Sequence, residues 1–104
     1  MLNPEIIETI NKTVTQITNV QKILLFGSYA RGEETTDSDI DICIITKNPK
    51  RNLDLIKDIR YSIFRKIKAP LDILIYKPKE FSIRSNMKYS LEEEIAHEGV
   101  LLYE

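Results

Sequence analysis

The sequence predicts a small α/β domain, because short apolar runs alternate with segments of helical periodicity. The runs at 22–26, 40–46 and 71–76 are rich in isoleucine and leucine and have the length of buried strands. Before and between them, apolar residues recur every three or four positions, as on an amphipathic helix. The chain has 104 residues, the size of one domain, which we expect to cover residues 1–104.

The first half of the chain predicts helix, strand, helical turn and strand. Asn3 is a favourable N-cap with Pro4 at the first helical position, and this helix is expected to end near Asn19. Residues 22–26 follow as a buried strand, and residues 28–33 as a short helical turn. A second buried strand is predicted over 40–46.

The second half predicts further helices around a third strand. A helix stripe is formed by Leu53, Ile56, Ile59, Ile63 and Ile67. Pro70 ends that segment, and residues 71–76 follow as a strand. A helix is expected over 79–84, and another from Ser90, whose spacing to Glu93 fits a capping box. Gly99 would end it before a terminal strand at 100–103.

Composition limits the classes of partner. Sixteen acidic and fifteen basic residues give a net charge of −1, so no global field draws the chain to a membrane, and no stable nucleic-acid binding is expected. No apolar run is long enough to span a bilayer, and the first residues do not resemble a signal peptide. The only cysteine, Cys43, lies in an apolar run. We therefore expect a cytoplasmic protein.

Two local clusters of basic residues stand out against this balanced charge. A cluster of this kind is either a solvated surface or an attraction for an anionic ligand or partner, and the sequence leaves both interpretations open. The first consists of Lys47, Lys50 and Arg51, and the second of Arg65, Lys66 and Lys68.

The end of the first strand has the features of a phosphate site. Gly27 lacks a β-carbon, so backbone amides can approach phosphate oxygens closely. Ser28 adds a hydroxyl at the start of the next helical turn, where free amides favour anions. Such a turn alone is more often only a turn, and its meaning depends on what accompanies it.

Three aspartates accompany it. Asp39 and Asp41 are two positions apart at the start of a strand, so their side chains share a face and can reach one Mg²⁺ site. Asp72 is the only charge within 71–76, where a carboxylate is costly unless it is paired or bound to metal. Together with Gly27 and Ser28, these residues indicate metal-dependent transfer of a phosphoryl or nucleotidyl group.

This pattern resembles the signature of the DNA polymerase β-like nucleotidyltransferase superfamily. The match consists of Gly27-Ser28, ten intervening residues and Asp39-Ile40-Asp41, with Asp72 as the third carboxylate. The fuller string Gly-Ser-Tyr-Ala-Arg-Gly, followed by Ser-Asp-Ile-Asp, is similar to the minimal nucleotidyltransferase (MNT) group.

The resemblance implies a nucleotidyltransferase fold, with a mixed β-sheet and flanking helices, two Mg²⁺ ions and ATP as the donor. Asp39 and Asp41 would hold the metals, and Asp72 would complete the metal site and favour deprotonation of the acceptor. Gly27 and Ser28 would hold the β- and γ-phosphates. Arg31 is either a further phosphate contact or a surface ion-pair partner of Glu33 or Glu34.

The resemblance also implies an acceptor. Stand-alone members of this group are commonly antitoxins paired with a HEPN ribonuclease toxin encoded nearby, and they transfer AMP to a tyrosine of that toxin. Two alternatives stay open: an antitoxin that acts by binding and occlusion with a vestigial site, and a small-molecule enzyme of the aminoglycoside-modifying type.

Some residues are set apart from this site. We expect His97 on the surface, Tyr29 in local packing, and the glutamates that begin at Glu92 on a solvated helix face. Tyr61, Phe64 and Phe81 are expected in the core or on a partner surface.

Overall fold

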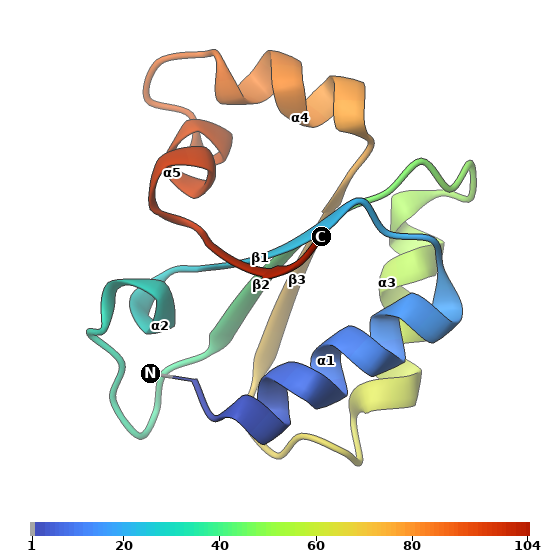
Figure 1. The fold of residues 1–104 in the computed structure, drawn as a ribbon, viewed down its shortest axis with the longest axis vertical. Coiled ribbons are helices and arrows are strands. Elements are labelled where there is room, and N and C mark those ends of the chain that lie inside the picture. The colour runs from blue at the N-terminus through green and yellow to red at the C-terminus, as the bar shows by residue number, and fades with distance from the viewer. Residues whose placement is uncertain (1) are drawn as a thin grey trace.

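The computed structural model describes residues 2–104, which fold into a mixed sheet with helices on both faces (Figure 1). This confirms the α/β class. Strands 22–26 and 71–76 agree with prediction, and the second strand is one residue shorter. In chain order the elements are α1 (Pro4–Ile17), β1 (Lys22–Phe26), α2 (Ser28–Arg31), β2 (Ile40–Ile45), α3 (Asn52–Ile63), β3 (Leu71–Tyr76), α4 (Pro78–Ser85), α5 (Leu91–Glu98) and β4 (Val100–Tyr103).

The strand order of the sheet is β3-β2-β1-β4. β1 runs antiparallel to both of its neighbours, whereas β2 and β3 are parallel. The carboxyl end of β1 therefore meets the amino ends of β2 and β3 at one edge of the sheet. The segments that carry the glycine-serine turn and the aspartates are thereby brought together.

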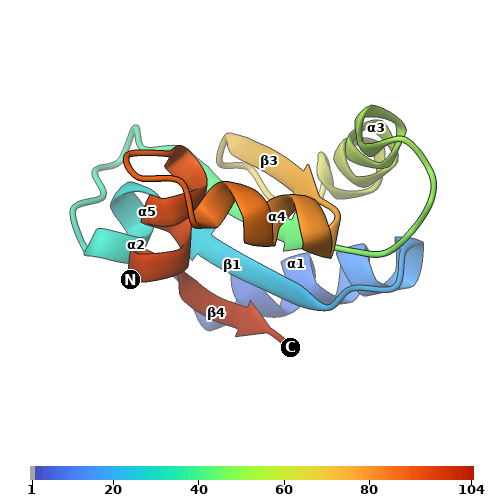
Figure 2. The same ribbon diagram turned by 90° about the horizontal axis from the view of Figure 1, so that it is seen from above.

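The two faces of the sheet carry separate hydrophobic clusters. Figure 2 shows α4 and α5 in front of the strands and α1 behind them. On the first face, Ile40, Ile42 and Ile44 of β2 pack with residues of α1 and α3 such as Ile10 and Ile59. The second face has a smaller cluster, in which strand residues pack against α4 and α5. Its members are Cys43, Ile45 and Ile95, with Leu24, Phe26, Leu74, Tyr76 and Phe81 around them.

The predicted helix starts are confirmed. The Asn3 side chain accepts a hydrogen bond from the Glu5 amide at 2.8 Å, and the Ser90 hydroxyl accepts one from the Glu93 amide at 2.9 Å. The first helix ends two residues before the predicted Asn19, at Ile17. No helix within residues 2–104 combines the length and the apolar character needed to cross a membrane.

One helical position was predicted wrongly. Leu53 is 56% exposed, and Leu55 takes the buried position instead. The buried stripe of α3 runs through Leu55, Ile59 and Ile63, which are four residues apart and share one face. Ile67 is buried as expected but lies in the loop after the helix.

The glutamate run at 92–94 is not a uniformly solvated face, which corrects a second prediction. Glu92 is buried, and its Oε2 accepts a hydrogen bond of 2.7 Å from the Tyr76 hydroxyl. Burial and the neighbouring Glu92 raise the pKa of the Tyr76 hydroxyl far above its usual range. His97 is exposed and Tyr29 packs against the first cluster, as expected.

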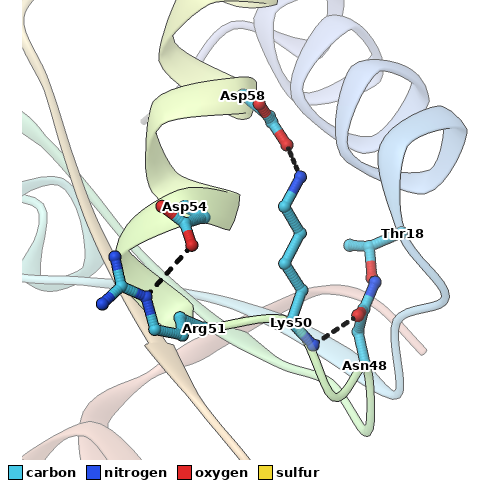
Figure 3. Close-up of polar contacts among 6 residues, drawn as sticks. All are labelled: Thr18, Asn48, Lys50, Arg51, Asp54 and Asp58. Atoms are coloured by element: carbon cyan, nitrogen blue, oxygen red, sulfur yellow. Dashed lines mark hydrogen bonds and ion pairs between the residues drawn. The ribbon is translucent and has the colours of Figure 1, made fainter.

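Ion pairs neutralise most of the first basic cluster (Figure 3). Lys50 Nζ lies 2.5 Å from Asp58 Oδ2, and Arg51 Nε lies 3.1 Å from Asp54 Oδ2. The loop is fixed further by Asn48, whose side chain accepts from the Lys50 amide at 2.9 Å. Lys50 and Arg51 thus tie this loop to α3 through their ion pairs.

Candidate active site

Asp41 and Asp72 are direct neighbours across the parallel strands β2 and β3. Asp41 lies between Ile40 and Ile42, both of which belong to the first-face cluster. Because side chains alternate along a strand, Asp41 projects from the second face. Asp72 follows Leu71, another first-face residue, and projects to the same side. Register and alternation together place two carboxylates side by side.

Gly27 lies against Asp41. Phe26, the last residue of β1, pairs with Asp41, and Gly27 follows directly. A β-carbon added to Gly27 would overlap the Asp41 carboxylate oxygen Oδ2. Gly27 also has φ 74° and ψ −155°, a conformation open essentially to glycine alone. The close approach that the sequence assigned to a phosphate is therefore made in this structure to the carboxylate.

The other predicted residues surround this pair. Ser28 is the first residue of α2 and follows directly after Gly27, the residue that lies against Asp41. Asp39 precedes β2 and is exposed. It is two positions before Asp41, the spacing at which side chains along a strand share a face. The structure thus brings Gly27, Ser28, Asp39, Asp41 and Asp72 to one edge of the sheet.

The surroundings of Asp41 disfavour its ionised form. Burial and the nearby charge of Asp72, with a further contribution from Asp39, raise the pKa of Asp41 to about 6. The positive charge of Arg31 acts in the opposite direction. A carboxyl group whose pKa is raised by neighbouring carboxylates is characteristic of sites that receive a cation or move a proton.

Arg31 forms the ion pair that the sequence offered as an alternative. Its Nε lies 2.6 Å from Glu33 Oε1, which confirms a contact with Glu33. Its Nη1 also lies 3.8 Å from Glu94 Oε1 and 3.9 Å from Glu98 Oε2 on α5. Those two partners could not be predicted from local sequence, because α5 is distant from α2 along the chain. The phosphate role of Arg31 stays a prediction.

The donor atoms fit a hard divalent cation. Magnesium binds carboxylate oxygens, and it commonly keeps several waters and substrate phosphates beside one or two carboxylates. Asp41 and Asp72 supply such a pair, and the charge of Asp39 also raises the pKa of Asp41. Within residues 2–104, however, no group of three or more acidic, cysteine or histidine side chains is already arranged to hold a metal. The fit therefore rests on two adjacent carboxylates and not on a closed cage.

Comparison with known proteins extends this geometry to a family. The model of the family described as "Polymerase beta, Nucleotidyltransferase" matches residues 8–104. A protein of Methanocaldococcus jannaschii named "Putative protein adenylyltransferase" is 32% identical over 98 residues, which cover 92% of this chain and 94% of that protein. Another of the same name and organism is 36% identical over 67 residues, which cover 61% of this chain but only 46% of that longer relative.

A solved structure shares the fold. A crystal structure of a toxin-antitoxin with AMP-PNP matches with a TM-score of 0.69 and covers 93% of this chain and 72% of that chain, at 19% identity. At this identity the likeness concerns the fold alone. The family match, which covers almost the whole sequence, agrees with the glycine-serine turn and the paired aspartates on adjacent strands. The chain accordingly belongs to the polymerase β nucleotidyltransferase family.

Proposed function

We propose that this nucleotidyltransferase is a magnesium-dependent protein adenylyltransferase, and that it acts as the antitoxin of a HEPN ribonuclease toxin encoded nearby. The observation that carries the proposal is the pair Asp41 and Asp72 beside the Gly27-Ser28 turn. The name of the relatives supports a protein acceptor, and the toxin-antitoxin neighbour supports a toxin as that acceptor.

The proposed reaction moves AMP from ATP to a tyrosine hydroxyl. The tyrosine oxygen forms a bond to the α-phosphorus, the bond from that phosphorus to the bridging oxygen of the β-phosphate breaks, and pyrophosphate leaves. Gly27 and Ser28 bind the β- and γ-phosphates. Asp72 accepts the hydroxyl proton or favours its loss. The acceptor oxygen is then free to attack in line.

Asp39, Asp41 and Asp72 would hold the metal. When bound there, Mg²⁺ would neutralise charge on the phosphate oxygens and on the leaving group. The raised pKa of Asp41 supports this assignment, because a cation would relieve the repulsion between Asp41 and its neighbouring carboxylates.

The test uses the purified protein, ATP labelled at the α-phosphate, Mg²⁺ and the protein encoded by the adjacent gene. Label should appear on a tyrosine of that protein and should disappear in Asp39→Asn/Asp41→Asn. The control Asp37→Asn removes an exposed aspartate two residues before Asp39 and should transfer label normally.

Other outcomes would decide between the alternatives. If toxin neutralisation in cells survives Asp39→Asn/Asp41→Asn, binding and occlusion account for the antitoxin effect, and the catalytic proposal is wrong. Label on an aminoglycoside, with none on the protein, would place the chain among small-molecule nucleotidyltransferases.

A further inference from the structure

The carboxyl end of α3 and the loop after it carry a cluster of exposed basic and aromatic side chains. Tyr61 is 86% exposed and Phe64 69%, and Arg65 Cζ lies 5.8 Å from the centre of the Phe64 ring. We call this surface the basic-aromatic patch. Its residues are Arg60, Tyr61, Phe64, Arg65, Lys66 and Lys68.

The basic residues of the patch have no ion-pair partners among residues 2–104. The other basic cluster differs, because Asp58 and Asp54 occupy Lys50 and Arg51. The sequence alone could not separate the two clusters. In the first cluster only Lys47 lacks an ion pair among the described residues, whereas none of the basic residues of the patch has one.

The surface is also shaped to receive side chains. Phe64 borders two neighbouring hollows of about 550 and 260 Å³. Tyr61, Arg65 and Lys66 line the larger one, and the smaller is largely apolar, with Ile63, Ile67 and Pro70 in its wall. Exposed aromatic and arginine side chains beside apolar hollows are typical of protein interfaces, where they serve as anchors.

The patch and the candidate active site lie at the same end of the sheet, on opposite faces. Arg60 Nη1 donates a 2.8 Å hydrogen bond to the carbonyl of Leu71, the residue directly before Asp72. The Pro70 carbonyl accepts a hydrogen bond of 2.8 Å from the Ile40 amide at the start of β2. Lys68 is four residues before Asp72, so their α-carbons are at most about 14 Å apart. A partner bound here would reach the aspartates around the end of the sheet, because α3 packs on the first face and the aspartates project from the second.

From these observations we propose that the basic-aromatic patch is the docking surface for an acidic face of the protein that supplies the acceptor hydroxyl. This inference rests on the proposed function for the identity of that protein. Unpaired positive charge attracts an acidic partner, and the apolar hollow beside Phe64 favours a partner with a side chain that fills it. A protein face fits better than a nucleic acid, because it can supply apolar side chains for the smaller hollow as well as acidic groups for the basic residues.

The experiment measures binding of the protein encoded by the adjacent gene, without nucleotide, at low and high salt. The first variant is Arg65→Glu/Lys66→Glu/Lys68→Glu. Its matched control is Lys22→Glu/Lys47→Glu/Lys79→Glu, which reverses three exposed charges at the opposite end of the sheet. At low salt we expect binding to weaken at least about tenfold in the first variant and less than about twofold in the control.

A second variant, Tyr61→Ala/Phe64→Ala, tests the anchors. Both side chains are largely exposed, so the variant should fold normally. Because the aromatic contacts are apolar, the loss of binding should persist at high salt, whereas the effect of the charge reversals should shrink there. A fluorescent ATP analogue should bind both variants and the wild type alike.

Several results would overturn the proposal. These are no binding of the adjacent-gene protein by the wild type, equal binding by all variants, or a parallel loss of ATP-analogue affinity, which would assign the patch to the nucleotide. Binding of a single-stranded RNA that is lost on charge reversal, while protein binding is unchanged, would assign it to nucleic acid.

Failure of docking and failure of catalysis remain distinguishable. Asp41→Asn should bind the partner normally but transfer no AMP. If the wild type transfers no AMP, yet charge reversal still abolishes partner binding, the docking surface stands and the proposed reaction is wrong.

Discussion

Gly27 and Asp41 are packed so closely that no β-carbon fits between them. The glycine comes from the end of β1 and the aspartate from the start of β2, and antiparallel pairing sets the two against each other. The proposed phosphate turn and the proposed metal ligand are therefore one structural unit, and a change in either displaces the other.

Gly27→Ala should reduce AMP transfer by roughly a hundredfold or more, because displacement of the Asp41 carboxylate by about 1 Å misplaces the reacting groups. It should also destabilise the fold by about 1–3 kcal/mol, since alanine is strained at this φ and ψ. Gly32→Ala is the matched control: Gly32 also has a positive φ, but its added β-carbon meets no atom within 4 Å. It should lose about 1 kcal/mol of stability and keep its activity. Equal activity losses would contradict the prediction.

Ionisation of Asp41 should destabilise the fold. Its folded-state pKa of about 6 lies above its ordinary value of 3.8, so the folded state binds the proton more tightly than the unfolded state does. This contribution to stability is fully present below pH 3.8 and is lost as the pH rises through 6. Because Asp41 is partly exposed, we expect a loss of about 1 kcal/mol after solvent screening.

The measurement compares Asp41→Asn with the wild type by urea denaturation in EDTA, at a pH below 4 and again above 7. The variant should be the more stable protein at the higher pH, and its advantage should vanish at the lower one. An advantage that does not depend on pH would rule out ionisation as its cause.

Tyr89 should be replaceable with a gain in stability. It is the only non-glycine residue in 2–104 with a positive φ, 66°, and its side chain is 97% exposed. Asparagine adopts this conformation more readily, so Tyr89→Asn should stabilise the fold by about 0.5–1 kcal/mol. Tyr61→Asn, at an exposed helical position, should give no gain. Thermal denaturation of both variants decides the point.

The Tyr76 hydroxyl should matter for stability. Tyr76→Phe removes the donor to a buried carboxylate, Glu92, and should cost about 1–3 kcal/mol in denaturant unfolding. Tyr103→Phe makes the same chemical change at a side chain that is 37% exposed and should cost much less. Similar losses in the two variants would mean that the bond to Glu92 contributes little.

The sequence predicted the parts of this fold that depend on local residues. Asn3 and Ser90 mark helix starts because capping is a contact between residues two or three apart, and isoleucine-rich runs mark strands because burial requires them. The site was predictable as a set, since two aspartates at alternate strand positions share a face. Their nearness to Gly27 was implied by the family resemblance, and the strand order, which no local signal contains, is its physical basis.

What the sequence could not give are contacts between distant elements. Glu92 looks like a solvated glutamate until Tyr76 is placed beneath it, and Arg31 meets Glu94 only because α5 lies near α2. Leu53 and Leu55 are equally apolar in the sequence, and only the packing of α3 on the sheet decides between them. The backbone conformation of Tyr89 has no residue signature either.

The position of β1 has a consequence for synthesis on the ribosome. β1 pairs with β2 and β3 lies next to β2, so the strands carrying the aspartates can assemble once residue 76 has emerged. The other edge of β1 is covered only by residues 100–103. Until those residues arrive, a nascent chain presents an open, leucine-rich strand edge, the feature through which unfinished chains pair wrongly with one another. A chain truncated between residues 76 and 100 would therefore be prone to misassembly.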